Sequence, residues 1–216
     1  MSDDTVIWFD LDGTLLAIDD YAVILQRACE ALGIDGEART TFVEAYDDEF
    51  LDALRSLRSE PYEHAASAGV AAADVAADPE AFVRELLDAE CAGSRVPDAV
   101  WETLDALDDY RVGVLTNGVD EWQREKLAYH GLDEVVDAVV VSEEAGAHKP
   151  DREVFGLAAD RLAADERWMV GDDREADVEG ARAAGWNAIH VAGPQEVPTV
   201  LDRLDAASPG SSAVGE

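Results

Sequence analysis

The chain has 216 residues, 48% of them hydrophobic, which is enough for one packed α/β core and a modest second domain. Its 49 acidic residues against 16 Lys and Arg give a formal net charge of -33, which argues against nucleic acid as a partner. No apolar run approaches the roughly 18 residues that a membrane span needs, and the chain opens without a basic and apolar leader, so we expect a cytoplasmic protein with no membrane partner.

Short apolar runs rich in β-branched residues predict buried parallel strands at residues 6–9, 112–115, 135–141, 168–170 and 188–191. Helical patterns at 121–130, 151–162 and 177–184 separate most of these runs. Asp120 is placed to cap the first of these helices, and Gly131 and Gly185 are placed to end the first and the last. This alternation predicts an α/β fold with a doubly wound parallel sheet, formed by residues 1–15 and 93–207.

Residues 16–92 interrupt this pattern with helical character and almost no strand signal. Candidate helices are 21–32, 37–57 and 79–90, the last with Asp78 as its N-cap and Pro79 at its first position. The alanine-rich stretch 65–77 receives no assignment. Residues 16–92 therefore predict an inserted helical domain, and residues 208–216, which are small and polar, predict a frayed tail.

Two carboxylates follow the first predicted strand, in the sequence Asp10-Leu11-Asp12-Gly13-Thr14. The carboxyl ends of strands are where open α/β sheets bind their ligands, and alternation places Asp10 and Asp12 on the same side of the backbone. A carboxylate there can attack phosphorus, while one two residues later can give a proton to the leaving oxygen and then take one from water. The alternative is an acidic turn that ends a strand.

Candidate phosphate-binding groups follow the next two predicted strands. Thr116 and Asn117 come directly after the strand at 112–115 and offer a hydroxyl and backbone N–H groups, although a Thr-Asn-Gly sequence alone is an ordinary turn. Lys149 follows the strand at 135–141 in a loop on the same sheet edge. A lysine at this place in so acidic a chain indicates neutralisation of an anion.

Another carboxylate group follows the strand at 168–170, and with Asp10 it forms a set of oxygen ligands suited to Mg2+. Its acids are Asp172, Asp173 and Asp177. Acid clusters are common in this chain, so a solvated acidic loop is the alternative. The joint order favours a site, because nucleophile, hydroxyl, lysine and metal acids each follow a predicted strand.

These residues resemble the four sequence motifs of the haloacid dehalogenase (HAD) superfamily, and with the helical insertion the resemblance covers nearly the whole chain. It implies subfamily I, with a Rossmann-like core and a mobile helical cap formed by residues 16–92. It further implies that Asp10 forms an aspartyl-phosphate and binds Mg2+. Asp12 would then be the acid and base, and its backbone carbonyl would bind the metal.

The remaining roles also come from the resemblance. Asp172 would complete the metal ligands, with Asp173 as a further ligand; Asp173 and Asp177 match positions that contact the metal directly in some members and through another ligand in others. Thr116 and the Asn117 backbone would hold the phosphoryl oxygens. Lys149 would balance the charge between the nucleophile and the substrate.

A longer set of residues resembles the branch that contains pyrimidine nucleotidases and N-acylneuraminate-9-phosphatases. The set comprises Thr116-Asn117-Gly118, Trp122-Gln123, Lys126-Leu127, Gly131-Leu132, Ser142-Glu143-Glu144-Ala145-Gly146 and Lys149-Pro150. The function implied is Mg2+-dependent hydrolysis of a small phosphorylated metabolite. Sugar phosphates, nucleotides and phosphoglycolate all stay open as substrates.

Three other functions are weighed against this one. A 2-haloacid dehalogenase needs neither Mg2+ nor an acid at position 12, so Asp12 and the pair Asp172-Asp173 argue against it. A phosphomutase would share the core, but nothing in the insertion requires one. A non-catalytic binding protein of the same fold usually lacks the nucleophile or a metal acid, and here all are present.

Composition gives two further expectations. Lys126 and Lys149 are the only lysines, and this acid-rich, lysine-poor balance resembles that of proteins from salt-accumulating halophiles, so folding and activity should need high salt. Molar salt shortens the Debye length to about 3 Å. Cys29 and Cys91 are expected to be free thiols, with a disulfide as the alternative.

A monomer or a homodimer is expected.

Overall fold

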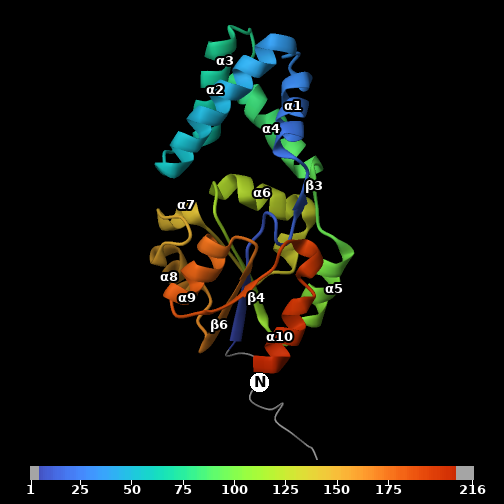
Figure 1. Ribbon diagram of the computed structural model, residues 1–216, viewed down its shortest axis with the longest axis vertical. Helices are drawn as coiled ribbons and strands as arrows, with labels where there is room; N and C mark the ends of the chain where they lie inside the picture. Colours follow the sequence, from blue (N-terminus) through green and yellow to red (C-terminus); the bar gives the residue numbers. More distant parts are fainter. Residues whose placement is uncertain (1–4, 208–216) are drawn as a thin grey trace, which may run out of the picture. The chain divides into compact units, whose positions relative to one another are not determined.

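The computed structural model describes residues 5–207, so the tail predicted at 208–216 lies outside the described residues. The chain divides into two compact units (Figure 1). The core unit comprises Met1–Ala17 and Val96–Glu216, and the helical unit comprises Ile18–Arg95. The insertion expected at 16–92 overlaps this helical unit, which begins and ends slightly later in the chain.

The core unit contains a five-stranded sheet with the order β5-β4-β1-β6-β7, in which all neighbours are parallel. Its strands are β1 (Thr5–Phe9), β4 (Arg111–Thr116), β5 (Ala138–Val141), β6 (Glu166–Gly171) and β7 (Asn187–His190). From central β1 the chain first adds strands on one side and then on the other. The order therefore reverses beside β1, which is where such sheets bind ligands at their carboxyl edge.

Helices connect these strands and cover the sheet. They are α5 (Asp98–Ala106), α6 (Asp120–His130), α7 (Ser142–Ala145), α8 (Arg152–Arg161), α9 (Gly180–Ala183) and α10 (Thr199–Ala207), with short turns η1 (Leu132–Glu134), the π-helical η2 (Arg174–Glu179) and η3 (Pro194–Glu196). The predicted doubly wound α/β fold is confirmed.

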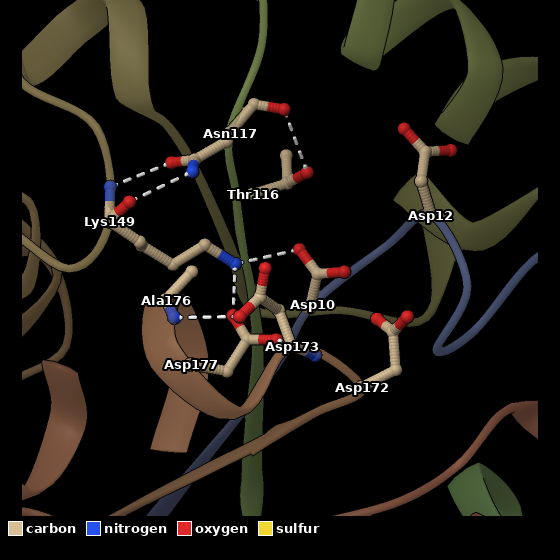
Figure 2. Close-up of a pocket in the computed structure, with 9 residues that line it drawn as sticks. All are labelled: Asp10, Asp12, Thr116, Asn117, Lys149, Asp172, Asp173, Ala176 and Asp177. Carbon is tan, nitrogen blue, oxygen red and sulfur yellow. Dashed lines mark hydrogen bonds and ion pairs between the residues drawn. The ribbon is translucent and has the colours of Figure 1, made fainter. Parts of the chain in front are cut away.

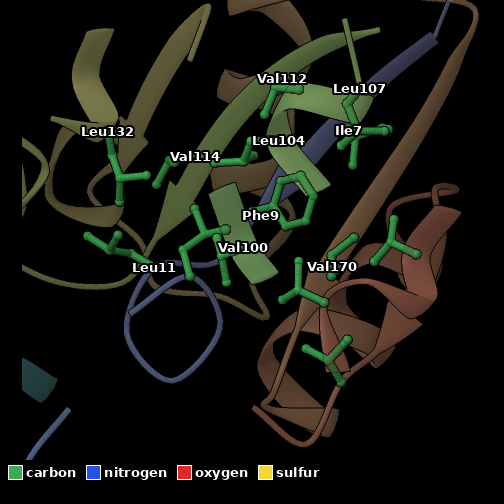
Figure 3. Packing of buried hydrophobic residues seen from close by; sticks show 14 of the residues in the cluster. Ile7, Phe9, Leu11, Val100, Leu104, Leu107, Val112, Val114, Leu132 and Val170 are labelled. Carbon is green, nitrogen blue, oxygen red and sulfur yellow. The ribbon is translucent and has the colours of Figure 1, made fainter. Parts of the chain in front are cut away.

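Alternation along β1 divides the core between the two faces of the sheet. Ile7 and Phe9 pack into one cluster with residues of α5 and α10 (Figure 3). Val6 and Trp8 pack on the opposite face, with residues of α8 and α9. All four side chains are fully buried. A central strand covered on both faces explains why its sequence is apolar without interruption.

Several element boundaries differ from the prediction, most by one or two residues, and three of the differences have a structural cause. Helix α6 begins at Asp120 itself, since Glu143 accepts the Asp120 backbone N–H at 2.7 Å, whereas its predicted end at Gly131 is confirmed by a left-handed φ of 73°. Strand β5 spans only 138–141, because Val135 belongs to the turn that ends η1, where its N–H donates to the Leu132 carbonyl at 3.2 Å. The helix expected at 177–184 starts earlier, as η2, with Asp173 as its cap.

The helical unit consists of four helices in the described part of the chain: α1 (Tyr21–Ala31), α2 (Gly36–Arg55), α3 (Pro61–Ala73) and α4 (Pro79–Ala92). Asp78 caps α4 as predicted, accepting the Glu80 N–H at 3.2 Å. The unassigned alanine-rich stretch lies mostly in α3. Gly69 of α3 allows close packing on Phe42, since a Cβ there would lie 2.8 Å from that ring.

The chain leaves and re-enters the core unit through two short strands, β2 (Ala17–Ile18) and β3 (Ser94–Arg95), which pair with each other. Cys29 and Cys91 are both buried thiols and do not form a disulfide with each other. Within residues 5–207, no helix has both the length and the apolar character of a membrane span.

Candidate active site

Asp10 stands at the carboxyl end of β1, in the middle of the sheet. Its backbone N–H donates to the Val170 carbonyl at 2.9 Å, so pairing with β6 continues to this residue, and only 8% of Asp10 is exposed. The next turn depends on Gly13, whose φ is +85° and where a Cβ would lie 2.6 Å from Asp172 Oδ2. Strand and turn together fix one buried carboxylate at the sheet edge.

Lys149 joins Asp10 to the far side of the site. Its Nζ donates to Asp10 Oδ1 at 2.7 Å and to Asp177 Oδ1 at 2.6 Å (Figure 2), and also to the Leu115 carbonyl at 2.8 Å. Burial lowers the pKa of this ammonium, but the charges of Asp10 and Asp177 outweigh burial and raise the pKa above its ordinary value. Lys149 is therefore a fixed cation.

The Asn117 side chain holds the Lys149 backbone. Its Oδ1 accepts the Lys149 N–H at 2.8 Å, and its Nδ2 donates to the Lys149 carbonyl at 3.2 Å. These two bonds connect the end of β4 to the loop after β5, which explains how Lys149 reaches Asp10 from a distant part of the chain.

Burial raises the pKa of Asp10 from 3.8 to about 7, and Asp177 adds to this rise while Lys149 opposes it. The carboxylate is thus short of positive charge even with an ammonium bound to it. Burial also raises the pKa of Asp172, although a hydrogen bond from the Thr14 hydroxyl at 3.1 Å opposes this.

Three carboxylates converge at this edge. One oxygen from each of Asp10, Asp172 and Asp177 lies within 4.8 Å of the others. They face a single ammonium, so two negative charges remain without compensation when all three are ionised. Uncompensated negative charge on hard oxygen donors favours a divalent cation such as Mg2+ at this edge of the sheet.

The roles of Asp173 and Asp177 differ in the structure. Asp173 Oδ1 accepts the N–H groups of Glu175 and Ala176 at 2.8 and 2.9 Å and so caps η2. Asp177 is 1% exposed, and its Oδ2 accepts the Asp173 N–H at 3.1 Å while its Oδ1 binds Lys149. The π-helical turn brings Asp177 back to the strand end.

Asp12 has partners of its own. Its Oδ2 accepts a bond from Lys126 Nζ at 2.6 Å and one from Gln123 Nε2 at 3.0 Å. Figure 2 shows the Asp12 carboxylate pointing away from the Asp10 carboxylate, although both line the same pocket. Gln123 also contacts Thr116 Oγ1 at 2.9 Å.

The predicted site residues lie together. One pocket, with a volume of about 230 Å³, is lined by Asp10, Asp12, Thr116, Asn117, Lys149, Asp172, Asp173, Ala176 and Asp177. Sequence reasoning gave no role to Gln123, Lys126 or Thr14, which hold the acids in place. The scarcity of lysine in this chain was the signal available for Lys126.

The chain is similar in sequence and in fold to known proteins. The sequence model of the haloacid dehalogenase-like hydrolases matches residues 5–185. Phosphoserine phosphatase of Thermus thermophilus is 45% identical over 82 residues, which are 37% of this chain and 33% of that protein. Ribulose-1,5-bisphosphate 5-phosphatase of Halopiger xanaduensis is 40% identical over 119 residues, 53% of this chain and 49% of that protein.

Pyrimidine 5'-nucleotidase YjjG of Escherichia coli is 35% identical over 95 residues, 40% of this chain and 42% of that protein. The matches thus span between 33% and 49% of the length of these curated relatives. Among solved structures, a HAD hydrolase of Bacillus subtilis bound to magnesium has a similar fold, with a TM-score of 0.67 and 21% identity over 92% of this chain and 98% of that one.

Proposed function

Because this chain belongs to the haloacid dehalogenase-like hydrolase family, we propose that it is a phosphatase that hydrolyses phosphomonoesters of small metabolites, with Mg2+ as cofactor and Asp10 as nucleophile. Relatives that act on phosphoserine and on ribulose 1,5-bisphosphate support this reaction class. The similarity to a pyrimidine 5'-nucleotidase supports the branch expected from the residues after Thr116.

The observation that carries the proposal is the carboxylate group at the sheet edge. Asp10, Asp172 and Asp177 are held together with one ammonium between them. Such an excess of negative charge would repel a phosphate dianion, so a phosphatase needs a cation here. A dehalogenase does not need this cation, because its substrate carries the leaving group on carbon and not on a phosphate.

We propose Asp10, Asp172, Asp173 and the backbone carbonyl of Asp12 as the residues that hold Mg2+. Asp177 is proposed to orient the site, since both of its oxygens already have protein partners. When bound, Mg2+ would offset the negative charge of the phosphoryl group and of the acids around it.

In the first half of the reaction, an Asp10 oxygen attacks phosphorus and the bond from phosphorus to the leaving oxygen breaks. Asp12, as the acid, gives its proton to that oxygen, so the product leaves as a neutral alcohol. The Lys149 ammonium, fixed 2.7 Å from Asp10 Oδ1, keeps the nucleophile oriented. The Thr116 hydroxyl and the backbone at Asn117 are proposed to bind phosphoryl oxygens.

In the second half, water attacks the phosphorus of the aspartyl-phosphate while Asp12, now a carboxylate, takes a proton from that water. The bond between Asp10 and phosphorus breaks, which returns the Asp10 carboxylate and releases inorganic phosphate. Asp12 ends protonated, as it began. Asp12 therefore serves as acid and base in turn.

We further propose that the enzyme works at high intracellular salt. The net charge of -33 and the similarity to a phosphatase of Halopiger xanaduensis support this proposal. The two buried thiols, which form no disulfide with each other, are compatible with a reducing cytoplasm.

The test is phosphate release in molar KCl, with and without Mg2+, from p-nitrophenyl phosphate and a panel of sugar phosphates, nucleotides and phosphoglycolate. Wild type should release phosphate only with Mg2+, and Asp10→Asn should lose this activity. No release by folded wild type, or halide release from a 2-haloacid instead, would contradict the proposal.

A further inference from the structure

The only two lysines of the chain each bind one of the two motif carboxylates. Lys149 contacts Asp10 at 2.7 Å, and Lys126 contacts Asp12 at 2.6 Å. The two lysine side chains are only 2% and 6% exposed. All other basic residues except histidines are arginines. A surface role does not account for lysines that are buried, and both positions lie at the acids that carry the chemistry.

Lys126 and Gln123 act on the same oxygen of Asp12. They lie three residues apart on α6, so their side chains share one face of the helix, and both are buried. Each donates to Oδ2, at 2.6 and 3.0 Å. Among the described residues, the other oxygen of Asp12, Oδ1, is buried and has no hydrogen-bond partner. The two donors thus fix the carboxyl group and leave Oδ1 for a proton.

Gln123 extends this support to the phosphate-binding loop. Its Nε2 lies 2.9 Å from Thr116 Oγ1 and 3.0 Å from the Asn117 carbonyl, besides its contact with Asp12. One buried amide therefore touches both the proposed acid and the loop proposed to hold the phosphoryl group. A rigid link of this kind sets the position of the proton donor relative to the phosphoryl group.

We propose that Lys126 and Gln123 are positioning residues for proton transfer by Asp12. This inference rests on the proposed phosphatase function. As the bond from phosphorus to the leaving oxygen breaks, its electron pair stays on that oxygen, which takes the proton carried by the Asp12 carboxyl group. The negative charge left on Asp12 develops beside the Lys126 ammonium, which keeps its own protons throughout.

The competing explanation is purely structural, with Lys126 serving only to neutralise a partly buried acid. The two explanations differ in how the effect depends on the leaving group. An alkyl phosphate needs a proton donor to expel its alkoxide, whereas p-nitrophenolate leaves without one. The value of kcat/KM reports the steps up to release of the alcohol, so it isolates the step in which Asp12 acts as acid.

The experiment measures kcat/KM of the Mg2+-loaded enzyme in molar KCl, for p-nitrophenyl phosphate and for the best alkyl phosphate of wild type. In Lys126→Met, we expect kcat/KM for the alkyl phosphate to fall about 100-fold, which is the lower end of the rate enhancements that general acid catalysis provides. For p-nitrophenyl phosphate, we expect kcat/KM to fall less than about 5-fold. Lys126→Arg should restore part of the loss. Adding Lys126→Met to Asp12→Asn should cause no further loss for the alkyl phosphate.

The matched control is Arg124→Met. Arg124 is a cation on the same helix, but its side chain is 43% exposed and pairs with Asp120 and Glu144, so its loss should leave the ratio of the two kcat/KM values unchanged. An equal loss on both substrates in Lys126→Met would overturn the inference. If that variant does not fold, Lys126→Arg and Gln123→Met are judged by the same ratio. Inactive wild type would instead reject the proposed phosphatase function.

Discussion

Replacing Lys149 with methionine removes the ammonium at the centre of the carboxylate group. Asp10 and Asp177, whose side chains are 11% and 1% exposed, would then face each other without it. Breaking a buried ion pair by removing one partner costs about 3–5 kcal/mol. For a chain of this size, that corresponds to a fall in Tm of roughly 6–20 °C. Activity should be lost as well, since Asp10 loses the group that orients it.

The assay is thermal unfolding of metal-free protein in molar KCl with a chelator, followed by circular dichroism. Arg124→Met is the control, because its exposed ion pairs should contribute less than about 1 kcal/mol each. Adding Asp177→Asn to Lys149→Met should recover much of the lost stability by removing one of the two acids, and activity should stay absent. If the Tm of Lys149→Met equals that of wild type, the buried ammonium does not stabilise the folded protein.

Three further predictions concern pH, the turn after β1 and salt. The pKa of Asp10 is about 7 in the folded protein, against an ordinary value of 3.8. Between these two values the folded metal-free protein holds a proton on Asp10 that the unfolded chain has lost. The stability that protonated Asp10 gives to the folded state is therefore lost as pH rises through 7. Asp10→Asn should therefore raise the Tm of metal-free protein, by more at about pH 8 than at about pH 5; an equal effect at both would contradict this. In Gly13→Ala the new methyl group would sit on a backbone with a φ of +85° and would collide with Asp172. Calorimetry should therefore show Mg2+ binding at least about 10-fold weaker, and phosphate release should fall. Unchanged Mg2+ binding would argue against this packing. With a net charge of -33, Tm should rise steeply from dilute buffer to molar KCl as self-repulsion is screened, and a flat salt response would count against a halophilic protein.

Much of the fold follows from patterns that act locally. The apolar run of β1 is buried on both faces, and Gly131 ends α6 in the left-handed conformation that favours glycine. The error at the start of α6 has a distant cause, since Glu143 of α7 accepts the Asp120 N–H that a cap residue would otherwise satisfy. Sequence near residue 120 contains no trace of that partner.

The site was predictable to the extent that it follows strand ends. Asp10, Thr116 and Asp172 each lie where a parallel strand meets the carboxyl edge, so the topology alone brings them together. Asp177 and Lys126 lie within or near helical segments, and their approach to the acids depends on the π-helical turn and on which face of α6 is buried. Such tertiary packing is not encoded in any short spacing.

Trapping the phosphorylated enzyme shows directly whether Asp10 is the nucleophile. Wild type would be mixed with Mg2+ and its best phosphomonoester in molar KCl, quenched in acid within one turnover, reduced with borohydride and digested for mass spectrometry. We expect Asp10 to be converted to homoserine, the reduction product of an aspartyl-phosphate, and no such product to form without substrate or in Asp10→Asn. Phosphate release by wild type with unmodified Asp10 under the same conditions, or a modification at another carboxylate, would contradict this role of Asp10.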